Sequence, residues 1–284
     1  MLKAYYALTK PGIIYGNLLT AIAGYLFASR WHIDILTFVG LALGTSLVIA
    51  SACVYNNYID RNIDKFMKRT KERALVRGVI SPKAALIYAA CLGLVGLTLL
   101  VVLTNWLVVL VGVVAFVDYI VFYGYTKRHS VYSTLVGSVS GSASIVAGYV
   151  AVTNHFDFNA LCLFLILTLW QMPHFYAIAI YRRTDYAAAG LPVLPVKKTV
   201  RIAQRQIMIY IVLLAATAIV FAIAGTASYI AMQLLAGISL AWFFYGLNTF
   251  KTEDPVAWAR RMFFFSLIVN LAISVTVAFG TIIP

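Results

Sequence analysis

The sequence predicts an all-α, polytopic membrane protein in which nine helices form one bundle, with residues 1–284 as a single domain. Two observations predict this class. Hydrophobic residues make up 63% of the chain and charged residues only 11%, so a water-soluble fold would expose far too much apolar surface. The apolar residues also gather in stretches of about 20, the length of helix that crosses a hydrocarbon core about 30 Å thick.

Nine such stretches follow one another along the chain. The first is long enough to span and lacks the small-residue cleavage site of a signal peptide. The second ends at Asn56, the fourth contains Asp118, and the third, seventh, eighth and ninth carry no charged residue. The fifth has Gly137 and Gly141 four residues apart, a spacing that favours close helix packing, and the sixth contains Pro173. The spans are expected at 12–29, 36–56, 85–104, 107–124, 132–153, 160–181, 206–225, 228–248 and 262–282.

The basic residues predict how the helices are oriented. All of the 22 Lys and Arg residues except Arg30 lie in the N-terminal arm or in the loops after the second, fourth, sixth and eighth spans. These segments share one side of the membrane, and Lys and Arg collect on the cytoplasmic side. The sequence therefore predicts a cytoplasmic N-terminus, a C-terminus outside, and charge-dependent chemistry on the cytoplasmic face.

The formal net charge of +13 has two explanations. One is this orientation together with attraction to anionic lipid. The other is that the two most basic loops, after the second and sixth spans, enclose an anion with its metal. Nucleic acid is excluded as a partner, because the basic residues are spread among membrane loops and form no domain that could grip a duplex.

Three polar residues at the end of the second span predict a metal site. Asn56, Asp60 and Asp64 are spaced i, i+4, i+8 and share one helix face, with neighbouring Cβ atoms about 5–6 Å apart. Unpaired carboxylates at this spacing repel each other, so a cation is expected between them. Carboxylate and amide oxygens suit Mg²⁺, which often bridges one or two carboxylates to a substrate phosphate.

The sixth span carries a second group of candidate residues. If its helix continues to Asp185, that carboxylate lies on one stripe with His174 and Tyr181, about 16 Å along the axis from the histidine. Gln171 lies one turn before His174, and Pro173 kinks the helix. A histidine within a span marks a functional site by default. The alternative is a core histidine that is hydrogen-bonded to a neighbouring helix.

Asp118, in the fourth span, is a further ionisable residue within the predicted membrane core. Charged side chains there face a protein interior or a cavity. Asp118 is therefore expected either to pair with a base such as Lys127 or to line a cavity of the bundle.

Several motifs, in collinear order along nearly the whole chain, resemble one family. They are Thr9-Lys10-Pro11-Gly12-Ile13-Ile14, Asn56-Asn57-Tyr58-Ile59-Asp60-Arg61-Asn62-Ile63-Asp64, Arg69-Thr70-Lys71, Leu75-Val76-Arg77-Gly78-Val79-Ile80-Ser81-Pro82, Lys127-Arg128-His129-Ser130-Val131-Tyr132, Trp170-Gln171-Met172-Pro173-His174, and Asp185-Tyr186 through Leu194-Pro195-Val196. This succession resembles the intramembrane prenyltransferase superfamily, and within it the branch that farnesylates protoheme. The resemblance implies nine helices around a lipid-accessible cavity in a bacterial inner (cytoplasmic) membrane, with two acidic motifs facing each other at its cytoplasmic mouth.

The resemblance also implies the substrates, the cofactor and the catalytic residues. Farnesyl diphosphate and protoheme (heme B) are the expected substrates and Mg²⁺ the expected cofactor. Membrane lipid surrounds the protein, and a terminal oxidase or other heme-processing proteins are expected to associate with it. Asn56, Asp60 and Asp64 would bind Mg²⁺ and through it the diphosphate, and Asp185 matches the second acidic motif; the three aspartates are the expected catalytic residues. The chain departs from the superfamily at Ala189, where a second acid is usual.

Further candidates follow from the chemistry of an allylic diphosphate, which leaves readily once its charge is neutralised. Arg73, Lys127 and Arg128 are the candidates for a cationic clamp on the departing oxygens. Lys68 is a weaker candidate, because its position four residues after Asp64 also suits a plain helix salt bridge.

On the heme side, we expect His174 either to contact the iron or to orient water. His129 would lie behind it, and Gln171 and Tyr181 complete the expected heme-binding set. By the same resemblance, the 2-vinyl group of protoheme attacks C1 of the farnesyl cation, and water then adds to give a hydroxyethylfarnesyl side chain.

Two other functions remain open at this point. A related prenyltransferase would use an aromatic quinone precursor as acceptor, and it differs in not retaining and converting heme. A transporter or heme carrier belongs to another class. Transporters are usually built from repeats with broken helices at the midplane, whereas this sequence has no persuasive repeat and its acids lie at the membrane edge.

Overall fold

The computed structural model describes residues 1–250 and 254–282. Nine helices of this described part are long and apolar enough to cross a membrane, which confirms the nine predicted spans. They are α2 (Pro11–Ser29), α3 (Ile35–Asp64), α4 (Pro82–Leu103), the continuous helix α5–η1–α6 (Trp106–Val117, Asp118–Phe122, Tyr123–His129), α7 (Ser133–Thr153), α8 (Phe158–Tyr181), α11 (Val200–Ile223), α12 (Tyr229–Thr249) and α13 (Pro255–Phe279). The other helices among the described residues are three short ones: α1 (Leu2–Leu8), α9 (Arg183–Ala188) and α10 (Leu194–Lys197).

Seven of the nine described spanning helices begin where a side chain accepts from a free backbone N–H group, whereas α2 and α7 have no such cap. Asp34 accepts from the backbone nitrogen of Thr37 at the start of α3, and Asp157 does the same at the start of α8. Asn105 caps α5, and Asp254 caps α13 well before the start predicted for the ninth span. Lys251, one of the basic residues of the predicted cytoplasmic loops, lies outside the described residues.

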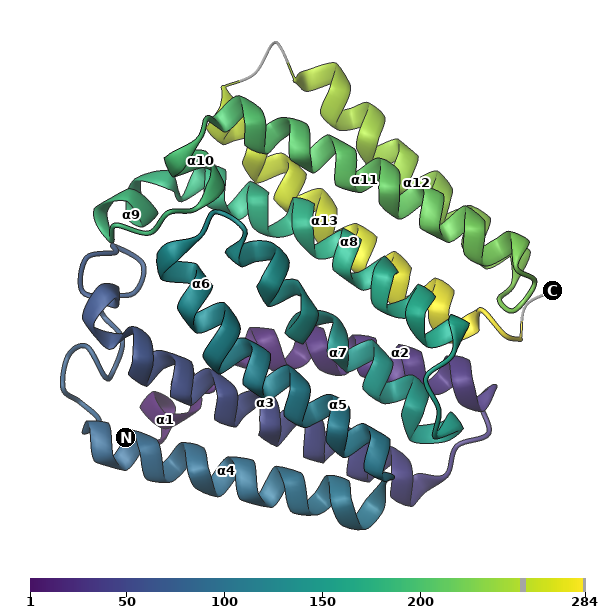
Figure 1. The fold of residues 1–284 in the computed structure, drawn as a ribbon, viewed down its shortest axis with the longest axis horizontal. Helices are drawn as coiled ribbons and strands as arrows, with labels where there is room; N and C mark the ends of the chain where they lie inside the picture. The colour runs from purple at the N-terminus through teal and green to yellow at the C-terminus, as the bar shows by residue number, and fades with distance from the viewer. Residues whose placement is uncertain (251–253, 283–284) are drawn as a thin grey trace.

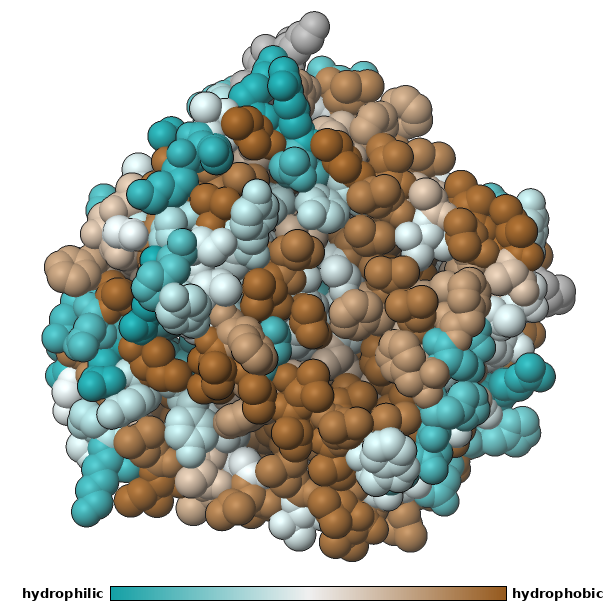
Figure 2. Space-filling model, in the orientation of Figure 1, coloured by the Kyte–Doolittle hydropathy of each residue, from teal (hydrophilic) through white to brown (hydrophobic). Residues whose placement is uncertain are grey.

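The bundle has two polar ends and an apolar middle. Figure 1 places α1, α9, α10 and the N-terminus at one end, and the C-terminus at the other. Figure 2 shows hydrophilic side chains along these two edges and a broad hydrophobic band between them. Large apolar side chains such as Leu94, Val102 and Ile223 are exposed, as expected of a surface that faces lipid. Termini at opposite ends agree with an odd number of spans; which end faces the cytoplasm stays a prediction.

Helix α7 lies at the centre of the bundle. It packs against α2, α5 and α8. In its most apolar 18-residue stretch, 56% of the residues are buried, whereas the share is 17% for α4 and for the helix that begins at Trp106. Two glycines let α2 and α7 approach closely. A Cβ atom at Gly24 would overlap the carbonyl oxygen of Ile145, and one at Gly148 would overlap that of Ala21.

This close approach predicts a difference between two identical substitutions on α2. Gly24→Ala is expected to lower the thermal midpoint of the detergent-solubilised protein, because overpacking of this kind costs about 1–3 kcal/mol. Gly16→Ala is the matched control, since its Cβ meets nothing within 4 Å and alanine favours a helix by about 1 kcal/mol over glycine. Equal midpoints for the two variants, measured by fluorescence-detected thermal unfolding, would contradict the α2–α7 contact.

Candidate active site

The acidic stripe of α3 lies on a regular helix. This helix continues to Asp64, eight residues beyond the predicted end of the second span, so Asn56, Asp60 and Asp64 stand on successive turns of one face. All three side chains are buried, with 3%, 2% and 1% of their surfaces exposed. Buried carboxylates need charged or hydrogen-bonding partners, and each of these finds a cation.

The cations come from the two segments that the clamp prediction named. Arg73 Nη1 lies 2.6 Å from Asp64 Oδ2. Lys127 Nζ pairs with Asp60 Oδ2, and Arg128 Nη2 lies 3.6 Å from Asp60 Oδ1 while it donates to the carbonyl of Ile59. The structure thus brings Arg73, Lys127 and Arg128 to the acidic stripe, and their action on a diphosphate stays a prediction.

Lys10 also lies in this site, although no role was predicted for it from the sequence. Its Nζ donates to Asn56 Oδ1 at 2.7 Å and lies 3.5 Å from the hydroxyl of Tyr119. Its backbone has a φ of 53°, a left-handed conformation that is uncommon outside glycine and that clusters at functional sites. Burial lowers the pKa of Lys10 to about 8, so the ammonium stays mostly charged at neutral pH. The Thr9-Lys10-Pro11 motif marked the segment but not its contact with Asn56.

Asp185 reaches the site from a separate short helix. Helix α8 ends at Tyr181, because Arg182 adopts φ −105° and ψ 15°, and α9 begins as a separate helix at Arg183. The predicted continuous stripe from His174 to Asp185 is therefore wrong. Asp185 is buried, and its Oδ1 accepts from the backbone nitrogen of Lys68 at 3.4 Å. This contact joins the second acidic motif to the loop that follows the first.

Lys68 contributes to this contact through its backbone alone. Its side chain is exposed, and no ion pair joins it to Asp64 in the part of the chain that the structure describes. The second carboxylate oxygen of Asp185 lies 3.9 Å from Arg182 Nη1.

The oxygens at the stripe fit a divalent cation that arrives with a phosphate. Asn56 Oδ1, Asp60 and Asp64 supply hard ligands of the type that Mg²⁺ prefers. Asp60 Oδ1 is buried and accepts no hydrogen bond from any residue described, which leaves one acceptor position open. No three His, Cys, Asp or Glu side chains of residues 1–250 and 254–282 lie close enough together to hold a metal by themselves. The four-residue ligand set that includes Asp185 stays a prediction.

Aromatic side chains of the fourth span face the acidic stripe. The span contains a π-helical turn at Asp118–Phe122, a feature that is frequent at functional sites. Tyr119 and Tyr123 stack with ring centres 5.5 Å apart, and Lys127 Nζ lies 5.8 Å from the centre of the Tyr123 ring. These two tyrosines were missed from the sequence, since no local pattern shows which face of the span they occupy.

Asp118 itself has a different partner from the one considered. Its Oδ2 accepts from the backbone nitrogen of Ser140 in α7 at 3.1 Å, whereas Lys127 pairs with Asp60. The predicted alternative of an Asp118–Lys127 pair is therefore wrong. The carboxylate links the π-helical turn to the central helix.

The heme-side candidates lie in three places. His174 Nδ1 lies 2.7 Å from Ser266 Oγ of α13, so the histidine does bond to a neighbouring helix. Tyr181 shares a ring neighbour with it, since both side chains pack against Phe263. Gln171 is buried between α7 and α8, where its Nε2 donates to Ser142 Oγ at 2.8 Å.

His129 stands apart from this group. It is the last residue of α6, its side chain is exposed, and its ring stacks on Tyr125. No contact found among the described residues connects it with His174.

An apolar groove runs beside the acidic stripe, between α3, α4 and α5. Its volume is about 370 Å³, and Ser51 and Tyr55 of α3, Leu94 and Leu97 of α4 and Phe116 of α5 are among its lining residues. Tyr55 directly precedes Asn56, and Phe116 lies one turn before Tyr119. Leu94 is 68% exposed on the apolar outer surface, so the groove reaches the face that lipid covers.

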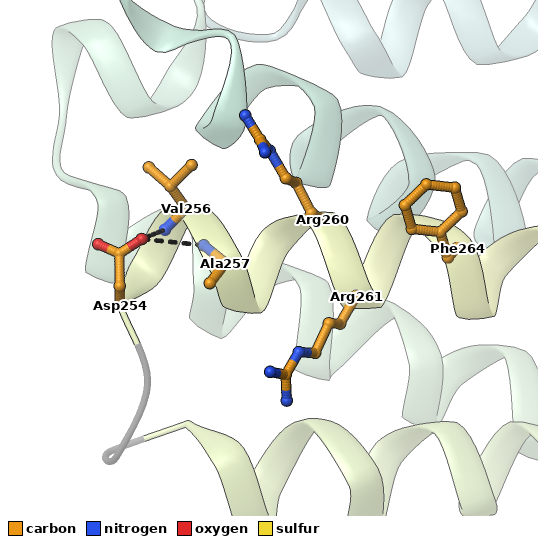
Figure 3. Close-up of a pocket in the computed structure, with 6 residues that line it drawn as sticks. All are labelled: Asp254, Val256, Ala257, Arg260, Arg261 and Phe264. Carbon is orange, nitrogen blue, oxygen red and sulfur yellow. Dashed lines mark hydrogen bonds between the residues drawn. The ribbon is translucent and has the colours of Figure 1, made fainter.

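A second pocket, of about 340 Å³, lies at the start of α13. Figure 3 shows Arg260, Arg261 and Phe264 around it and the carboxylate of Asp254 turned to the backbone. Asp254 Oδ2 accepts from the backbone nitrogens of Val256 and Ala257 at 3.1 and 3.0 Å. Because this carboxylate is engaged in capping α13, the pocket is not a candidate for the metal-dependent site.

Comparison with known proteins gives one family. The model of the UbiA prenyltransferase family matches residues 17–268. The protoheme IX farnesyltransferases of Klebsiella pneumoniae and Photorhabdus laumondii are 49% and 47% identical to the whole chain, which covers 97% of each of them. Among solved structures, a digeranylgeranylglyceryl phosphate synthase matches 99% of the chain and 98% of its own with a TM-score of 0.80 at 21% identity. A UbiA homolog from Archaeoglobus fulgidus bound to GPP and Mg²⁺ matches 96% of the chain and 99% of its own with a TM-score of 0.74 at 16% identity.

Proposed function

The chain belongs to the UbiA prenyltransferase family, and we propose that it transfers the farnesyl group of farnesyl diphosphate to the 2-vinyl group of protoheme IX (heme B), giving heme O and diphosphate. The observation that carries the proposal is the identity of 47–49% over the full chain to proteins named protoheme IX farnesyltransferase. The paired acids and bases at one end of an apolar bundle support it, because an allylic diphosphate has a charged head and an apolar tail.

Asn56, Asp60, Asp64 and Asp185 are the residues that would hold Mg²⁺. The solved UbiA homolog with GPP and Mg²⁺ supports a need for this ion in the family. When bound, Mg²⁺ neutralises charge on the diphosphate and so makes it a better leaving group. The proposed ligand atoms are the buried side-chain oxygens of these four residues. In the structure they contact, in the same order, Lys10, Lys127, Arg73 and the backbone nitrogen of Lys68.

The basic residues would bind the diphosphate oxygens and stabilise their charge as the C1–O bond breaks. Arg73, Lys127, Arg128 and Lys10 already lie at the acidic stripe, so little reorganisation is needed. At an effective dielectric constant of about 20, one charge pair at 4 Å contributes on the order of 4 kcal/mol. Several such contacts together are enough to favour ionisation of an allylic diphosphate.

The farnesyl chain would lie in the apolar groove between α3, α4 and α5. Val48 also lines the groove. It lies eight residues before Asn56, so the groove extends about 12 Å along the axis of α3 from that residue. Water is excluded from such a surface, and the rings of Tyr119 and Tyr123 near the polar end can attract a cation. The allylic cation would thus persist until the vinyl carbon attacks C1. Water then adds to the resulting heme-side cation and loses a proton.

We place the protein in a bacterial cytoplasmic membrane with this site on the cytoplasmic face. The bacterial relatives and the clustering of Lys and Arg support that location. The product would pass to a terminal oxidase or another heme-processing protein.

The test is a conversion assay with the purified protein. Heme B, farnesyl diphosphate and Mg²⁺ are expected to give a product heavier by one farnesyl group and one hydroxyl group, detected by mass spectrometry, and chelation of Mg²⁺ should stop its formation. A quinone precursor supplied instead of heme serves as the competing acceptor. Farnesylation of that acceptor with no heme product would contradict the proposal, and so would movement of heme across vesicles without release of diphosphate.

A further inference from the structure

The hydrogen bonds around His174 determine which of its ring nitrogens carries the proton. Ser266 Oγ donates its single proton to the carbonyl of Phe263, so toward His174 it can only accept. The contact of 2.7 Å between Ser266 Oγ and His174 Nδ1 therefore needs a proton on Nδ1. In the neutral imidazole, Nε2 then has a free lone pair.

Ser266 of α13 makes a second contact with α8, the helix that carries His174. Its side chain is fully buried, and its carbonyl accepts from Trp170 Nε1 at 2.7 Å. Trp170 and His174 lie one turn apart on α8, with ring centres 5.0 Å apart. Two hydrogen bonds to one residue of α13 therefore hold both the position and the orientation of the histidine ring.

The free nitrogen is not fully enclosed and has aromatic surroundings. The His174 side chain is half-buried. Its Nε2 has no hydrogen-bond partner within the described ranges. It is also not among the fully buried polar atoms that lack a partner, so some of its surface is exposed. The rings of Phe175 and Phe263 lie 5.1 and 4.9 Å from the histidine ring. A neutral imidazole whose other nitrogen is tied by a hydrogen bond is the usual form of a histidine that binds a metal.

We propose that His174 Nε2 ligates the iron of the protoheme acceptor and that Ser266 is the positioning residue that sets its tautomer. The identity of the acceptor rests on the proposed function. His174 lies seven residues before the end of α8, about 10 Å along the axis, and that end leads directly to Asp185. The heme would thus be held deeper in the bundle than the acids that bind the diphosphate.

Ligation is tested without the second substrate. Ferric protoheme titrated into the purified protein is expected to give the absorption and electron paramagnetic resonance spectra of a histidine-bound heme. His174→Ala should lose this spectrum and weaken heme binding at least about 10-fold, and added imidazole should restore the spectrum. His174→Gln serves as a second variant if the alanine variant folds poorly. The control is His32→Ala, which removes an exposed histidine of the opposite end of the bundle.

Ser266 is tested against a serine of the same helix. Ser274 is also buried on α13, but its hydroxyl donates to the carbonyl of Asn270 in its own helix. Ser266→Ala is expected to weaken heme binding about 10- to 100-fold and to raise KM for heme more than it lowers kcat. Ser274→Ala should change neither value.

The outcomes separate this inference from the proposed function. An unchanged heme spectrum in both His174 variants would overturn ligation, and equal effects of Ser266→Ala and Ser274→Ala would remove the positioning role. If the spectrum depends on His174 but no heme O forms with farnesyl diphosphate, ligation stands and the proposed reaction fails. If His174→Ala makes heme O with an unchanged KM for heme, the reaction stands and ligation fails.

Discussion

Replacing Asp64 by Asn is expected to lower kcat/KM for farnesyl transfer at least about 100-fold while the bundle stays folded. Asp64 is 1% exposed, lies in the last turn of α3 and pairs with Arg73 at 2.6 Å. Asparagine keeps the size and one accepting oxygen but removes the negative charge that holds a divalent cation. Loss of one preorganised electrostatic contact in an active site commonly costs about 3–4 kcal/mol, and Asp60→Asn should behave alike.

The measurement is heme O formation over a range of farnesyl diphosphate and Mg²⁺ concentrations. The matched control is Glu72→Gln, which removes an exposed acid of the same loop region whose ion pair, among the residues described, is with Arg77 at 3.1 Å. It should leave the rate unchanged. Turnover at the wild-type rate in Asp64→Asn would remove the acidic stripe from the reaction, whereas loss of the folded protein in size-exclusion chromatography would point to a structural role for the charge.

The sequence was sufficient for features that repeat over short distances. The nine spans were predictable because a stretch of about 20 apolar residues leaves a helix as the only way to satisfy its backbone in lipid. Asn56, Asp60 and Asp64 could be placed on one face for a similar reason, since a spacing of four is set by the geometry of a single helix. The regularity of α3 up to Asp64 then confirmed that common face.

The partners of these residues could not be derived in this way. Lys10 and Asn56 are 46 positions apart, and Asp60 and Lys127 are 67 apart, so each contact depends on how whole helices pack. Asp185 was misplaced for a local reason, because Arg182 ends α8 without a proline or glycine to signal the break. The partner of Asp118 could not be derived either, because it is a backbone nitrogen, which residue types do not reveal.

The second large effect is expected from Lys127, and it separates stability from catalysis. Lys127 pairs with Asp60, and only 2% of the Asp60 side chain is exposed. Lys127→Met would leave that carboxylate with Arg128 at 3.6 Å as its nearest cation. Removing one partner of a buried ion pair typically costs about 3–5 kcal/mol, because the remaining buried charge is not hydrated and has lost its closest partner. The variant should therefore unfold at a clearly lower temperature and should also lose farnesyl transfer.

A double-mutant cycle distinguishes the two consequences. Asp60→Asn combined with Lys127→Met removes both charges, so the double variant is expected to be more stable than Lys127→Met alone, with a coupling of about 1–3 kcal/mol. Its activity should stay absent, because neither the acid nor the base remains at the stripe. Arg128→Met is the control for stability, since this cation is 38% exposed and an exposed pair contributes less than about 1 kcal/mol. Additive losses of stability in the cycle would show that Lys127 and Asp60 do not depend on each other, and recovery of turnover in the double variant would show that the pair serves the fold and not the reaction.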